Sequence, residues 1–311
     1  MGTAGFVHEA LVHRDDDAYV AATVDFLREG VRAGETAVAL LGPRGRELLA
    51  DALDGSGVRV VDTTDLGRNP ARLIPTLRDL LETARGPLRC VDNSTRATHD
   101  PAAAAETALH EALLNLAFDD AIDFRLRCTV DADALPEAEH SHPTVLDGGT
   151  SRPGAAYDPD HGYAVFARPL PEATTPLDLD DVHFTLDDLP ELRDLVTVRS
   201  SAFGLSRDRA LDLTLATNEI VTNSIVHGGD RGTLRTWHDD HTFTCEVTDS
   251  GHITNPLVGR VSPIPAVQGG RGVWLANRLC DLVSIRSAPG TGTVVHLQVD
   301  RQVAPGPLPQ R

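Results

Sequence analysis

Apolar and polar positions along the first half of the chain follow two periods that replace each other several times. Short apolar runs typical of buried strands are separated by longer stretches in which apolar residues recur every three or four positions. Strands that alternate with helices favour a mostly parallel sheet, so we predict one α/β domain over residues 1–150. The pattern predicts strands at residues 36–41, 59–61, 88–91 and 124–130 and helices at residues 16–33, 45–53, 71–84 and 102–118.

The periodic pattern fades between residues 144 and 176, where glycine, proline and acidic residues become more frequent. Such a composition is typical of a segment between two domains, and we predict a linker over residues 151–177. Within it, residues 162–167 are a short apolar stretch that would suit one further strand. The second domain is then expected at residues 178–300 and a disordered tail at residues 301–311.

The longest helical pattern lies in the second half of the chain. No proline or glycine interrupts residues 207–227, and two glycines follow directly, as at a helix C-cap. Glu219, Asn223 and His227 stand four residues apart and therefore line one stripe of this helix, between apolar residues. Because burying a carboxylate and an amide without partners is costly, and Mg²⁺ prefers oxygen donors, the stripe indicates a magnesium site. The alternative is a Glu/Asn pair that caps a neighbouring element or forms hydrogen bonds in a core.

Two glycine-containing motifs follow this helix. Residues 242–248 alternate like a half-buried strand, which Asp249-Ser250-Gly251 ends. An Asp at the end of a buried strand can accept a hydrogen bond from the amine of adenine, and Gly251 lets a purine approach the backbone. The glycines of residues 269–272 precede an apolar helix whose first N–H groups would bind an anion, with Arg271 as a charged donor. Taken singly, the two motifs also suit an ordinary turn and a loop without a ligand.

The order and spacing of these three segments resemble the N box and the two glycine boxes of the GHKL ATP-binding domain. The resemblance covers residues 184–299 and implies an α/β sandwich of the Bergerat type that binds Mg-ATP. It also implies that Glu219 and Asn223 hold Mg²⁺ and the attacking group, with Glu219 as the catalytic base, and that Asp249 recognises adenine. The other nucleotide-binding positions that it implies are Asn223, His227, Gly251, Gly270, Arg271, Gly272 and Thr293. His252 and Ile253 depart from the usual first glycine box, so the pocket wall is expected to differ there.

Within that superfamily the segments look most like the anti-sigma-factor serine kinases, the RsbA/RsbW-like regulators. The resemblance implies a regulator of transcription in the stress response, which uses ATP and Mg²⁺ to phosphorylate a Ser or Thr of an anti-anti-sigma (STAS) protein and can also bind a sigma factor. One alternative is a non-catalytic binding module gated by ATP. A second is a sensor histidine kinase, because His110-Glu111 opens an apolar helix, although no second long helix with coiled-coil periodicity follows it.

The first half of the chain has a set of scattered polar and turn-forming residues, which include His8, Asn69, Pro70, Glu111, Asn115, Cys128, His142, Pro143 and Tyr157. Through these residues it resembles the MEDS sensory domain of methanogen and methylotroph regulators. A signature that reads Cys-Pro-Tyr-Asp in that family reads Cys128-Thr129-Val130-Asp131 here, so the ligand of this domain stays unknown. The alternative is an α/β domain that serves only to contact another protein.

Composition narrows the classes of function. The chain of 311 residues has a formal charge of −18, which disfavours direct binding to nucleic acid or anionic lipid. All 28 basic residues are arginines, so a P-loop lysine, a Schiff-base lysine and a lysine general base are excluded. The four cysteines are far apart in apolar patterns and fit reduced thiols. No signal peptide or bilayer-spanning run is recognisable, so we expect a cytoplasmic protein. The sequence does not decide whether the protein forms a homodimer.

Overall fold

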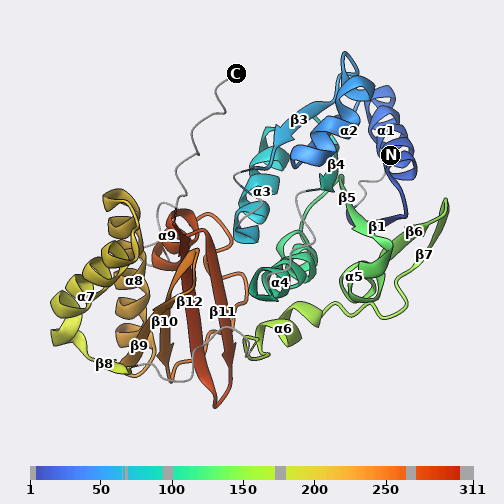
Figure 1. Cartoon of the computed structure of the whole chain (residues 1–311). Coiled ribbons are helices and arrows are strands. Elements are labelled where there is room, and N and C mark those ends of the chain that lie inside the picture. The colour runs from blue at the N-terminus through green and yellow to red at the C-terminus, as the bar shows by residue number, and fades with distance from the viewer. Residues whose placement is uncertain are drawn as a thin grey trace, which may run out of the picture. The chain divides into compact units, whose positions relative to one another are not determined.

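The computed structural model of the chain forms two compact units, Met1–Val165 and Phe166–Arg311, each with a sheet of its own (Figure 1). The domain limits predicted from the sequence stay predictions, and the tail beyond Arg301 lies outside the described residues. The structure describes residues 5–64, 66, 69–93, 101–171, 180–263 and 271–301.

The first unit is built on a seven-stranded sheet in the order β3-β2-β4-β5-β1-β6-β7. Neighbouring strands run parallel except for β6 and β7, which pair antiparallel. The mostly parallel sheet predicted from the sequence is therefore confirmed. Its strands are β1 (Phe6–His13), β2 (Thr36–Leu41), β3 (Arg59–Asp62), β4 (Leu88–Asn93), β5 (Phe124–Asp131), β6 (Thr144–Asp147) and β7 (Thr150–Pro153).

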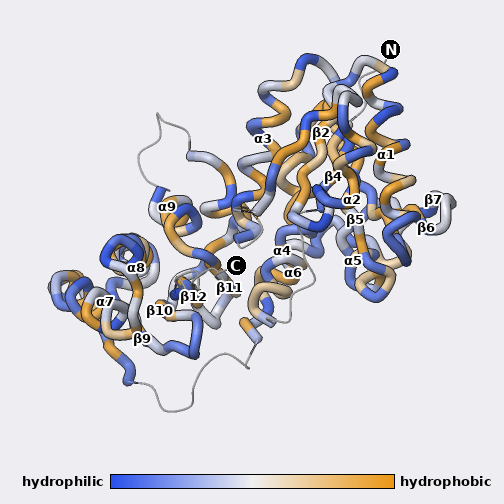
Figure 2. Tube along the Cα trace, turned by 45° about the horizontal axis from the view of Figure 1, so that its top comes forward, coloured by the Kyte–Doolittle hydropathy of each residue, from blue (hydrophilic) through white to orange (hydrophobic). Residues whose placement is uncertain are grey.

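The helices of this unit connect successive strands and pack on the sheet. Helix α1 covers the residues predicted for it: it begins where the Asp15 carboxylate caps the Ala18 N–H at 2.8 Å and ends at Gly34, whose φ is +77°. Figure 2 shows hydrophobic residues along strand β2, whereas α1 alternates hydrophilic and hydrophobic positions, as a helix on the surface of a sheet does. The helices are α1 (Asp16–Ala33), α2 (Pro43–Leu53), η1 (Pro70–Arg72), α3 (Leu73–Thr83), α4 (Pro101–Ala117), η2 (Ala132–Ala134), α5 (Leu135–Ser141) and α6 (His161–Phe166).

The further strand that residues 162–167 suggested is wrong, because residues 162–166 lie in helix α6 and residue 167 follows it in a turn. His161, Gly162, Val165 and Phe166 are buried while the two residues between them are exposed, which is the spacing of a helix face. Short apolar runs of this length do not by themselves distinguish a strand from a helix.

The second unit contains an antiparallel five-stranded sheet in the order β11-β12-β10-β9-β8. Three helices pack on one face of this sheet (Figure 1). This arrangement confirms the predicted α/β sandwich. Its elements are β8 (Val182–Phe184), η4 (Leu186–Asp188), α7 (Leu189–Phe203), α8 (Arg207–His227), β9 (Gly232–His238), β10 (Thr242–Asp249), α9 (Arg271–Leu279), β11 (Leu282–Ala288) and β12 (Gly292–Asp300).

Helix α8 has the limits that the sequence predicted. The Ser206 hydroxyl accepts from the Arg209 N–H at 3.4 Å at its start, and Gly228 follows its last residue. None of the helices in the described part of the chain combines the length and the apolar character that crossing a bilayer requires.

Candidate functional site

Segments far apart in the sequence meet where the second half of α8 faces the start of α9. A Cβ atom added to Gly272 would lie 2.9 Å from Glu219 Oε2 and 3.1 Å from Asn223 Nδ2. The first turn of α9 therefore packs closely on a carboxylate and an amide of α8, and a residue larger than glycine would push these side chains aside. The side chains of Glu219 and Asn223 are half-buried. These contacts bring three predicted residues, Glu219, Asn223 and Gly272, together.

The carboxylate of Asp249, at the end of β10, is held from two sides. Its Oδ2 accepts from the Ser224 hydroxyl at 2.6 Å, and its Oδ1 accepts from the Gly251 N–H at 2.7 Å. Gly228 makes room for it, because a Cβ there would lie 2.4 Å from Asp249 Cγ. The carboxylate is thus fixed in orientation, and each oxygen keeps a lone pair for a further donor, such as an adenine amine.

Thr293, near the start of β12, ties the turn after β10 to the terminal hairpin. Its hydroxyl donates to the Gly251 carbonyl at 2.9 Å and lies 2.8 Å from the Ser287 hydroxyl. Ser287 accepts in turn from the Ile253 N–H at 2.9 Å. The backbone beyond Asp249 is therefore positioned by β11 and β12.

The remaining predicted residues are less enclosed. His227, the last residue of α8, is exposed, so the predicted stripe divides into a half-buried pair and an exposed end. Arg271 is the first residue of α9 and is also exposed. Gly270 lies outside the described residues.

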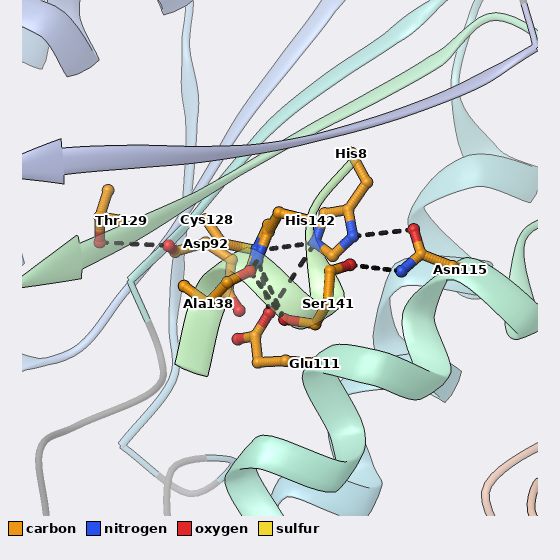
Figure 3. A network of polar contacts seen from close by, with 9 residues as sticks. All are labelled: His8, Asp92, Glu111, Asn115, Cys128, Thr129, Ala138, Ser141 and His142. Carbon is orange, nitrogen blue, oxygen red and sulfur yellow. Dashed lines mark hydrogen bonds and ion pairs between the residues drawn. The ribbon is translucent and has the colours of Figure 1, made fainter. Parts of the chain in front are cut away.

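Four polar residues of the first unit also lie close together, two of them on the neighbouring strands β1 and β5 (Figure 3). They are His8, Glu111, Cys128 and His142. Burial raises the pKa of Glu111 to about 8, and the negative charge of Asp92 adds to the rise. Burial also lowers the pKa of His142 to about 4, lowers the pKa of His8 well below its usual range, and raises the pKa of the Cys128 thiol. Desolvation thus disfavours the charged form of each of the four groups.

Two known families match different parts of the chain. Residues 182–299 match the family described as histidine kinase-like ATPase domain, and residues 7–143 match MEDS, the methanogen/methylotroph, DcmR sensory domain. The chain joins a MEDS domain to a histidine kinase-like ATPase domain. An ATPase domain implies ATP binding.

Among solved structures, this chain is similar to the RsbU and RsbW domains of Rv1364c from Mycobacterium tuberculosis. The match has 19% identity and a TM-score of 0.29, and it covers 40% of this chain and 33% of that chain. This chain thus spans about a third of that structure's length. A search of curated proteins found no match.

Several residues that shape the candidate site at α8, β10 and α9 were not predicted from the sequence. Ser224 and Gly228 orient or admit Asp249, and Asn277 of α9 donates from its buried Nδ2 to the Gly259 carbonyl at 2.9 Å. Gly259 has a φ of +69° and a Cβ there would lie 2.3 Å from Val273, so the chain after Gly251 returns to pack on α9. The sequence offered one signal for these residues: Ser224 lies on the buried side of the long helix predicted at residues 207–227.

The MEDS domain also has a cavity of about 570 Å³ at the carboxyl ends of its parallel strands. His13 ends β1, Gly42 follows β2, Asn93 ends β4 and Asp131 ends β5, and all four line it. Ligands of open parallel sheets bind at this edge. A small ligand of the MEDS domain would be expected there.

Proposed function

We propose that the ATPase domain binds Mg-ATP and transfers the γ-phosphate to a Ser or Thr of an anti-anti-sigma (STAS) protein. The protein would then be a cytoplasmic partner-switching regulator that also binds a sigma factor. The observation that best supports this proposal is the contact of Gly272, at the α9 N-terminus, with Glu219 and Asn223, beside the fixed carboxylate of Asp249.

Each residue of the site has a role that its position supports. Asp249 would accept a hydrogen bond from the adenine amine. The N–H groups of the first turn of α9, together with Arg271, would face the phosphates, as at other helix N-termini that bind anions. Phosphoryl transfer requires chiefly positioning and charge neutralisation, which this arrangement supplies. Glu219 would take the proton of the attacking hydroxyl.

The oxygen donors of the α8 pair fit Mg²⁺. The amide of Asn223 lies against Gly272 and has an oxygen that can ligate a cation, and Glu219 adds a carboxylate. Magnesium usually takes only one or two protein ligands, with phosphates and water as the others. When bound, the ion would neutralise charge on the phosphates.

The MEDS domain, over residues 1–150, would respond to a ligand of unknown identity and tune the domain at residues 178–300. Coupling of this kind requires that the ligand favour one state of the protein over another. The charge of −18 on the chain suits a basic partner surface and disfavours nucleic acid.

A sensor histidine kinase is the weaker alternative. His110 is 1% exposed, and its Nδ1 lies 2.7 Å from the Glu106 carbonyl in the same helix. A buried side chain of this kind is a core residue rather than an accessible phosphate acceptor.

The test is transfer of labelled phosphate from ATP to candidate STAS proteins by the full-length protein. Glu219→Gln should slow transfer by about a hundredfold or more at unchanged ATP affinity, because general-base catalysis contributes that much. Asp212→Asn, two helical turns earlier on α8, is the matched control and should transfer at the normal rate. Normal transfer by Glu219→Gln would refute the assignment of the base. ATP binding without transfer by the wild-type protein would identify the ATP-gated binding module instead.

A further inference from the structure

Four residues with metal-ligating side chains converge inside the MEDS domain. His8 comes from β1, Glu111 from α4, Cys128 from β5, and His142 directly follows α5. One ligand atom from each lies within 4.8 Å of the ligand atoms of the other three. Figure 3 shows these side chains pointing toward one another from the four elements.

Three of the six separations between these atoms are close to those of a tetrahedral metal site. His8 Nε2 lies 3.3 Å from Cys128 Sγ and 3.8 Å from Glu111 Oε2, and His142 Nε2 lies 3.5 Å from Glu111 Oε2. Zinc–nitrogen bonds of about 2.0 Å and zinc–sulfur bonds of about 2.3 Å place neighbouring ligand atoms roughly 3.3–3.5 Å apart. The four side chains would therefore need little movement to surround one ion.

Both histidines already present the correct nitrogen. The Asn115 amide donates its Nδ2 to the Ser141 carbonyl at 2.6 Å, which turns its oxygen toward His8 Nδ1 at 3.1 Å. His142 Nδ1 lies 2.9 Å from the Ala138 carbonyl. Each Nδ1 therefore carries the proton and each Nε2 directs its lone pair into the cluster. Outer hydrogen bonds of this kind fix the tautomer of metal-ligating histidines.

The centre of the cluster holds acceptors that lack a donor. Glu111 Oε2 and His142 Nε2 are buried without a hydrogen-bond partner, and the His142 side chain is 1% exposed. Buried polar atoms of this kind cost free energy unless they are paired. The nearby carboxylate of Asp92 makes the surroundings more negative still. A cation at the centre would pair with both Glu111 Oε2 and His142 Nε2.

A network of hydrogen bonds alone does not satisfy the cluster. The thiol of Cys128 has one proton, which it can donate either to His8 Nε2 at 3.3 Å or to the carboxylate of Glu111, but not to both. A protonated Glu111 would have to donate to His142 Nε2 across 3.5 Å, which is longer than an O–H donor ordinarily spans. One buried acceptor would remain without a donor.

We propose that His8, Glu111, Cys128 and His142 bind one Zn²⁺ ion within the MEDS domain. Two imidazoles and a thiolate favour zinc over Mg²⁺ or Ca²⁺, which prefer oxygen ligands. Four protein ligands close the coordination shell, so the ion links β1, α4, β5 and the end of α5. None of these four residues belongs to the proposed nucleotide site, so zinc binding can be tested without measuring kinase activity.

The experiment is zinc binding by the full-length protein, first stripped with a chelator and then titrated with Zn²⁺ in competition with a chromophoric chelator. One equivalent of zinc should bind, and bound zinc should raise the midpoint of thermal unfolding. With Co²⁺ in place of zinc, a thiolate-to-cobalt charge-transfer band should appear. Cys128→Ser should abolish that band, whereas Cys90→Ser, a change of an equally buried cysteine on β4, should retain it.

A further variant separates metal binding from folding. Asn115→Ala keeps all four ligands but frees the His8 ring, so zinc affinity should fall by about 10–100-fold. Substoichiometric zinc in the refilled wild-type protein, or a cobalt complex without the thiolate band, would overturn the proposal. Equal zinc affinity in the Cys128→Ser and Cys90→Ser proteins would do so as well. If Cys128→Ser does not fold, the wild-type stoichiometry, the wild-type cobalt spectrum and the Asn115→Ala affinity still decide.

Discussion

Replacing Asp249 by Asn tests whether this residue reads the base of the nucleotide. Asn keeps the shape of the side chain, can still accept from the Gly251 N–H, and can turn its amide group toward the Ser224 hydroxyl, which can also accept. The turn should therefore remain folded. What is lost is a charged acceptor for the adenine amine. Because a hydrogen bond to a charged group contributes about 1.5–3 kcal/mol, ATP affinity should fall by roughly 10–150-fold.

The same carboxylate should discriminate between bases. It would face the carbonyl of guanine with a second acceptor, so the wild-type protein should bind GTP at least about tenfold more weakly than ATP, a difference of about 1.4 kcal/mol. In Asp249→Asn this preference should shrink, because the new amide can donate to guanine. Calorimetric titration of the full-length protein with Mg-ATP and Mg-GTP measures both ratios.

Asp239→Asn is the matched control for this measurement. Asp239 precedes the same strand at its other end and also accepts from backbone N–H groups, those of His241 and Thr242, both at 2.7 Å. It should lower stability slightly without changing nucleotide affinity. Wild-type ATP affinity in Asp249→Asn, or equal affinity of the wild-type protein for ATP and GTP, would refute the assignment.

Two further predictions concern the ATPase domain. Gly272→Ala should lower the free energy of unfolding by about 1–3 kcal/mol and weaken ATP binding, because the new Cβ displaces Glu219 and Asn223; urea unfolding and calorimetry measure both, and unchanged values would contradict the close packing. Burial alone would raise the pKa of Glu246, but the hydrogen bond to His296 and the charge of Arg235 lower it overall. Its stabilising effect is therefore present above the unfolded pKa of about 4.3 and is lost as pH falls through the folded value. Glu246→Gln should cost about 1–3 kcal/mol at pH 7 and less at pH 4, and an equal loss at both would show that this charge does not stabilise the fold.

Elements whose limits depend on neighbouring residues were predictable from the sequence. Helices α1 and α8 begin and end where predicted, because Asp15, Gly34, Ser206 and Gly228 act on the backbone within a few residues of themselves. The order of the two glycine-containing motifs after α8 likewise indicated an ATPase domain, which the family match supports. These features need no knowledge of what packs against them.

Strand β1 and helix α6 depended on tertiary contacts. His8, Glu9 and His13 interrupt the apolar pattern of β1, so no strand was predicted there, yet β1 lies between β5 and β6 near the middle of the sheet. Residues 162–167 carried an apolar pattern too short to distinguish a strand from a helix. The pairing of β1 with β5 and β6 decided the first, and the helically spaced burial of residues in α6 decided the second. Both depend on the neighbours that the fold supplies.

The sites show the same division between local and long-range information. The sequence pointed singly to Glu219, Asn223, Asp249 and Gly272, but the hydrogen bond from Ser224 and the packing of Gly272 arise only when α8, β10 and α9 come together. Likewise, the residues of the proposed zinc site lie on elements that are far apart in the sequence. Strand order brings these elements into contact. The sequence alone determined which side chains were available, and the tertiary structure decided which of them meet, because strand pairing and helix packing join residues more than a hundred positions apart.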